Sequence, residues 1–132
     1  MLTLFPIHFL APLAYTALRL CIACIFLHQG IHHIHGRNSL KKVFILPVFP
    51  FPTFILWYLC ITEITISILM FLGAYTQIAA LLAMLLSGKF IAMHNRFLHT
   101  LIPSQLFYIL LFFASLSLFI TGAGAFAIDL PI

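Results

Sequence analysis

The chain has 132 residues, of which 64% are hydrophobic and only 6% are charged, and its formal net charge is +4. A soluble domain carries roughly 25% charged residues, so this composition excludes an ordinary water-soluble fold and predicts a membrane protein. The six basic residues form no dense or aromatic-interleaved run, which excludes nucleic-acid binding despite the positive charge. A bilayer core needs about 20 apolar residues per helix, so residues 1–132 are expected to form a single domain with four spanning helices.

The first predicted helix covers about residues 12–35 and ends before a polar segment. No Lys or Arg precedes this apolar stretch and it contains no clear small-residue cleavage site, so we interpret it as a retained helix rather than a signal peptide. Residues 37–42 form the densest polar cluster of the chain and are expected to form a loop. Three prolines then delay the next helix, because proline lacks a backbone donor and disfavours helix in the residue before it. They are Pro47, Pro50 and Pro52.

Three further helices are predicted at about residues 53–73, 77–95 and 104–121. The segment 73–76 is only long enough to reverse the chain into an antiparallel neighbour. Continuous helices are expected because every backbone donor inside the hydrocarbon must be satisfied within its own segment. The predicted fold class is therefore an all-α membrane protein, a four-transmembrane-helix antiparallel bundle.

The loop charges predict the orientation of the bundle. Arg37, Lys41 and Lys42 follow the first helix and Arg96 follows the third, which places all four on one side of the membrane. Because basic loops resist translocation, these two loops are expected in the cytoplasm and both chain termini outside.

Two charged residues are expected inside the spans, Arg19 in the first helix and Glu63 in the second. An unpaired charge in lipid costs at least about 2.5 kcal/mol on insertion scales, so the two are predicted to pair in the interior. Asp129, just beyond the fourth helix, is a further candidate partner of Arg19. Two interpretations remain open: the pair fixes helix packing only, or it forms a polar pocket that binds a head group such as a quinone carbonyl.

Histidines are the second unusual feature, since His28, His32 and His35 follow one face of the first helix and His94 lies near the same membrane side. Neutral imidazoles at this spacing can ligate a metal or haem iron, with His28, His32 and His94 as candidates. We favour an interfacial location for most of these rings over a metal or haem site. His28 is deeper and is expected within reach of Glu63, so it joins the predicted polar centre.

The first helix also resembles a known family pattern. Arg19, Phe26 and Gly30 match the first-helix pattern R-x-x-x-G-x-x-F-x-x-x-G-x-x-K of the DoxX family, with Ala23 in place of the first glycine and His33 in place of the lysine. The resemblance continues through two later patterns, E…G-x-x-T-x-x-A-A and G-x-G-x-x-S-x-D. Their residues here are Glu63, Gly73, Thr76, Ala79, Ala80, Gly122, Gly124 and Asp129, with Ala125 at a usually basic position and Ala127 in place of the serine.

This resemblance implies a four-helix protein of the bacterial inner membrane, with Arg19, Glu63 and Asp129 as its polar centre. The family is named after the small membrane subunit of a thiosulfate:quinone oxidoreductase, and a functional link through the fold is an analogy. The leading hypothesis is an accessory subunit that binds a quinone, a lipid head group or a membrane redox partner without a complete catalytic set of its own. The alternatives are a membrane-embedded oxidoreductase with a His-ligated cofactor and a structural or assembly protein.

Overall fold

Five helices make up the described part of the protein, which contains no strand. The computed structural model describes residues 10–42, 52–92, 102–122 and 124. The all-α part of the predicted fold class is confirmed for these residues. The helices are α1 (Ala11–His35), α2 (Arg37–Leu40), α3 (Pro52–Leu72), α4 (Thr76–Ala92) and α5 (Gln105–Thr121).

The helix ends differ from the sequence-based expectation in two places. The predicted loop after α1 contains the one-turn helix α2, whose Leu40 is fully buried and anchors the turn to the core. The helix α3 begins at Pro52 instead of after it, because a proline in the first helical turn loses no intrahelical hydrogen bond. The end predicted for the third long helix, near residue 95, lies outside the described residues.

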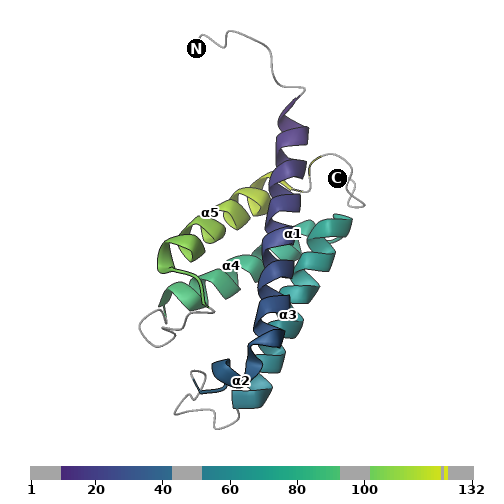
Figure 1. Ribbon diagram of the computed structural model, residues 1–132. Helices are drawn as coiled ribbons and strands as arrows, with labels where there is room; N and C mark the ends of the chain where they lie inside the picture. The colour runs from purple at the N-terminus through teal and green to yellow at the C-terminus, as the bar shows by residue number, and fades with distance from the viewer. Residues whose placement is uncertain (1–9, 43–51, 93–101, 123, 125–132) are drawn as a thin grey trace.

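The helices form two pairs. Figure 1 shows α1 and α3 side by side along the length of the molecule, with α4 and α5 as a second pair inclined to the first. The turn between α3 and α4 is tight, with left-handed backbone at Gly73 and Tyr75, and the N–H of Ala74 donates to the carbonyl of Leu69 over 3.2 Å. Smaller contacts of α3 with α4 and of α1 with α5 join the two pairs.

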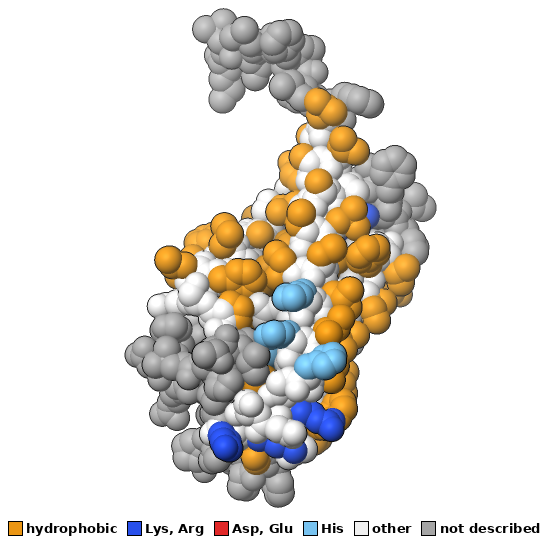
Figure 2. Space-filling model, in the orientation of Figure 1, with side chains coloured by type: hydrophobic (Ala, Val, Ile, Leu, Met, Phe, Trp, Pro, Cys, Tyr) orange, Lys and Arg blue, Asp and Glu red, His pale blue; other side chains and the backbone are white. Residues whose placement is uncertain are grey.

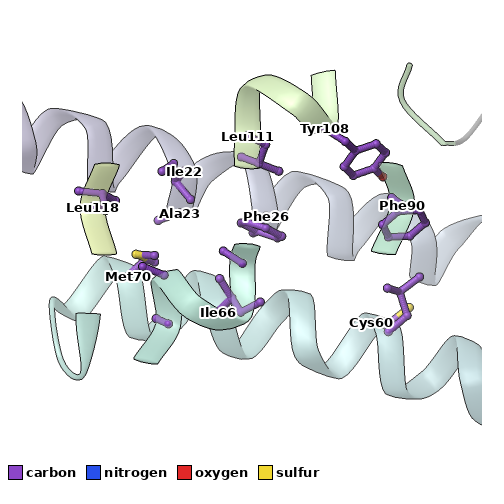
Figure 3. Packing of buried hydrophobic residues seen from close by; sticks show 14 of the residues in the cluster. Ile22, Ala23, Phe26, Cys60, Ile66, Met70, Phe90, Tyr108, Leu111 and Leu118 are labelled. Carbon is purple, nitrogen blue, oxygen red and sulfur yellow. The ribbon is translucent and has the colours of Figure 1, made fainter. Parts of the chain in front are cut away.

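Apolar side chains from all four long helices form one core. Figure 3 shows Phe26 of α1 and Ile66 of α3 between the helices, with Leu111 of α5 close by. Phe90 of α4 stacks on Tyr108 of α5 with ring centroids 4.6 Å apart. Small residues let α4 approach its neighbours closely, a common feature of helix packing in membranes. They are Ala79, Ala80 and Ala83, all fully buried.

The outer surface is largely apolar, which agrees with a membrane environment. Figure 2 shows hydrophobic side chains distributed over the visible face, while Lys and Arg side chains gather mainly at one end. The helices α1 and α3 are each long and apolar enough to cross a membrane by length and composition. The helices α4 and α5 are apolar and have 17 residues each. Every long helix exposes large apolar side chains, whose contact with water would be unfavourable and whose contact with lipid is favourable.

Candidate functional site

A buried pair of ionisable side chains joins α1 to α3. The Nδ1 atom of His33 lies 2.8 Å from Oε2 of Glu63, and the two side chains are 1% and 2% exposed. Buried polar groups in a membrane protein are costly unless they bond each other, so this contact compensates both residues. Because imidazole and carboxylate can each hold a proton, the pair can donate and accept hydrogen bonds in the interior of the protein.

Close packing of the two backbones makes this contact feasible. A Cβ atom at Gly30 would lie 3.0 Å from Cγ1 of Ile64 and 3.5 Å from Cβ of Glu63, so a side chain at this position would push α1 away from α3. Further along the same interface, the hydroxyl of Ser67 donates to the carbonyl of Ala23 over 2.8 Å. These two contacts fix the antiparallel register that places His33 beside Glu63.

The same register separates Arg19 from Glu63. Arg19 is 2% exposed and lies on the buried face of α1, but it is eleven residues before Gly30, about 16 Å along the helix axis. Glu63 therefore contacts His33 and not Arg19, which was the partner expected from the sequence. The other predicted partner of Arg19, Asp129, lies outside the described residues.

The remaining histidines of α1 lie on its outer face. His28, expected near Glu63, is exposed and stacks on exposed His32 with ring centroids 5.8 Å apart, and the third exposed ring is that of His35. Figure 2 shows histidine side chains along α1, above the Lys and Arg cluster. In the described part of the chain no three His, Cys, Asp or Glu side chains gather as a metal site would require, and His94 lies outside that part.

A second polar contact joins α1 to α5. The hydroxyl of Tyr108 donates to Oε1 of Gln29 over 3.4 Å, and both side chains are buried. Gln29 lies one helical turn before His33 on the same face of α1, so the two contacts share one side of the helix. Neither Gln29 nor Tyr108 was predicted from the sequence. The signal for Gln29 was its four-residue spacing to His33, which places two polar residues on one helix face.

The DoxX family model matches residues 14–95, which is more than half of the chain. The chain belongs to the DoxX family. No curated protein and no solved structure shows significant similarity to it.

The positions of the first-helix DoxX pattern all lie on one face of α1. Arg19, Ala23, Phe26, Gly30 and His33 are all buried, and they recur at intervals of three and four residues. The signal that could have identified the partner of Glu63 was therefore present in the sequence: the histidine stands at the lysine position of the pattern.

The later part of the DoxX resemblance also lies in the interior. Thr76, Ala79 and Ala80 are buried on α4. A Cβ atom at Gly124, whose φ is +74°, would lie 2.9 Å from the carbonyl oxygen of Pro12 and 3.1 Å from the backbone nitrogen of Thr16. Only glycine fits so close to another backbone in this conformation, so Gly124 packs against α1 one turn before Arg19.

Proposed function

We propose that this DoxX-family protein is a membrane accessory subunit whose His33 and Glu63 pair binds the polar head of a quinone. The buried contact between the two side chains carries the proposal. A quinone carbonyl accepts hydrogen bonds, and an imidazole N–H is a suitable donor. The hydroxyl of Tyr108, which donates to Gln29 in the structure, would turn from Gln29 to the quinone as a second donor on the same side of α1. A lipid head group with hydrogen-bond acceptors is the alternative occupant.

The redox chemistry would belong to a partner subunit in the membrane. The link between the family name and a thiosulfate:quinone oxidoreductase supports this assignment by analogy only. In this arrangement the protein positions a quinone and the partner supplies or removes electrons. Arg19 and Asp129 would form a separate polar point near the outer end of α1, a proposal supported by the packing of Gly124 on α1 one turn before Arg19.

We further propose that all four long helices span the bacterial inner membrane as an antiparallel bundle. The 17 residues described in each of α4 and α5 extend about 26 Å, close to the thickness of a bilayer core. The loop charges support cytoplasmic loops after the first and third long helices, with both termini outside. A periplasm-only reporter fused after Ile132 should be active and one fused after Asn38 silent; the reverse pattern would exclude this orientation.

The binding proposal is tested by quinone content. The protein is purified from its native membranes in mild detergent, and bound quinone is quantified after extraction for the wild type, Glu63→Gln and His33→Leu. Thr65→Val is the control, because Thr65 is exposed and its hydroxyl bonds only to Ile61 of its own helix. We expect quinone with the wild type and the control and a loss of at least roughly tenfold in the other two.

Two outcomes would reject quinone binding at this pair. One is wild-type protein that retains no quinone and binds none when ubiquinone or menaquinone is added. The other is a stable His33→Leu/Glu63→Leu double variant that retains quinone and full activity of the host pathway, which would reduce the pair to helix packing. Haem absorbance in the purified protein would instead favour the His-ligated oxidoreductase.

A further inference from the structure

A pocket lies where the end of α1 meets α2 and the first turns of α3. It is an open, shallow hollow of about 10 Å³, which has room for about one water molecule. The surface that lines it is apolar, and the cationic groups of Arg37 and Lys41 lie at its rim, so the hollow and its rim differ in chemistry. The lining residues are Ile34, Arg37, Lys41, Leu56, Trp57 and Cys60.

The lining residues are ordered by depth along the helices. Arg37 and Lys41 follow the end of α1, at the end of the molecule where the basic side chains gather. Trp57 is five residues into α3, and it is the only tryptophan in the chain. Cys60 lies nearly one turn deeper. Charged, aromatic and apolar groups therefore succeed one another as the phosphate, glycerol and acyl regions of a lipid leaflet do.

The positive charge at the rim has no acidic neighbour among the described residues. Glu63 is the one acidic residue described there, and it is buried in contact with His33. The guanidinium carbon of Arg37 lies 5.8 Å from the centroid of the Trp57 ring, which holds the cation at the mouth of the pocket. An anion with an apolar extension would complement the rim and the apolar surface beside it.

We propose that this pocket binds one anionic phospholipid of the leaflet on the side of α2. The phosphate contacts Arg37 and Lys41, the glycerol region lies against Trp57, and the first part of an acyl chain lies over Ile34 on the outside of the hollow. Basic pockets between membrane helices commonly hold anionic head groups, whereas a zwitterionic lipid would bring a second cation to the same rim. This site is separate from the His33 and Glu63 pair and does not depend on quinone binding there.

The single tryptophan provides a direct test. The full-length protein is reconstituted in phosphatidylcholine bilayers that contain increasing fractions of phosphatidylglycerol or phosphatidylcholine with brominated acyl chains, which quench tryptophan on contact. We expect half-maximal quenching at a roughly tenfold lower fraction of the brominated anionic lipid. Arg37→Gln/Lys41→Gln should remove this preference. Lys42→Gln/Lys89→Gln removes the same net charge from exposed residues outside the pocket and should keep it.

A second variant separates the cavity from its charges. Ile34→Phe fills the hollow and leaves every cation in place, so it should also lose the preference, and it keeps the test available if the Arg37→Gln/Lys41→Gln protein does not insert. Equal quenching by both lipids in the wild type would overturn the proposal. An equal loss of the preference in the Lys42→Gln/Lys89→Gln control would also overturn it, because that loss indicates a net-charge effect. Relief of quenching by millimolar inorganic phosphate would overturn it too, because it indicates a soluble-anion site.

Discussion

The imidazole of His33 lies 2.8 Å from the carboxyl group of Glu63 because Gly30, one turn earlier on α1, has no side chain to hold α3 away. Position 33 corresponds to the lysine of the DoxX first-helix pattern, and histidine is the shorter side chain. A short partner needs a short distance between helices. The glycine and the pair therefore act as one unit: the close approach allows the contact, and the contact compensates the buried carboxyl group.

A double-mutant cycle should measure this contact. His33→Leu leaves the Glu63 carboxyl group buried without its partner and is expected to lower the free energy of unfolding by about 3 to 5 kcal/mol. The His33→Leu/Glu63→Leu protein should lose less than the sum of the two single variants, with a coupling of roughly 0.5 to 3 kcal/mol. Reversible unfolding in mixed micelles gives these values. His33→Leu with Thr65→Val is the control pair and should be additive; additivity at His33 and Glu63 would contradict the contact.

Gly30 should tolerate a methyl group less well than Gly88 does. Gly88→Ala places its Cβ no closer than 3.8 Å to Phe112, so it should gain up to about 1 kcal/mol of stability from the better helix propensity of alanine. Gly30→Ala meets Ile64 at 3.0 Å and should be destabilising by about 1 to 3 kcal/mol as α1 and α3 separate. Thermal unfolding in detergent compares the two. Equal stability changes for the two variants would show that the interface between α1 and α3 can accommodate a methyl group at position 30.

Most of the helical architecture could be predicted because it depends on local properties. Long apolar segments between polar or proline-containing stretches indicate α1 and α3 directly. The helix α2 could not be predicted in this way, because a four-residue helix leaves no periodic signal and forms here around one buried side chain, Leu40. The inclination of the second helix pair to the first is likewise set by side-chain packing that no hydropathy pattern contains.

The candidate site was predicted only in part, for a related reason. Charge alone identified Glu63 as a buried residue that needs a partner. Which residue of α1 faces it depends on the register between the two helices, and that register is set by Gly30 and Ser67 together. The spacing of residues within one helix does not determine this register, so Arg19 and His28 were expected where His33 lies. Roles for Arg19 and Asp129 in binding remain predictions.

Ser67 should contribute more to stability than Ser87, although both serines are buried. The hydroxyl of Ser67 donates to the carbonyl of Ala23 on another helix, whereas that of Ser87 donates to Ala83 of its own helix. Removal of an interhelical bond in a membrane protein costs about 0.6 kcal/mol on average, so Ser67→Ala should be destabilising by about that amount or somewhat more. Ser87→Ala should be close to neutral. The same mixed-micelle titration measures both, and the opposite ranking would contradict the register described for α1 and α3.

Cysteine labelling should reveal which exposed surface faces lipid. Cys21 and Cys24 are exposed on the middle of α1, whereas Cys60 is buried. A charged maleimide is excluded from hydrocarbon, so the first two should react slowly in membranes despite their exposure. The reference is Asn38→Cys, at an exposed position of α2, in a background with the native cysteines replaced by alanine. With a charged maleimide added to permeabilised membranes, this cysteine should react at least roughly tenfold faster than Cys21 or Cys24, as followed by mass spectrometry. Comparable rates at all three positions would mean that this face of α1 meets water or a hydrated partner instead of lipid.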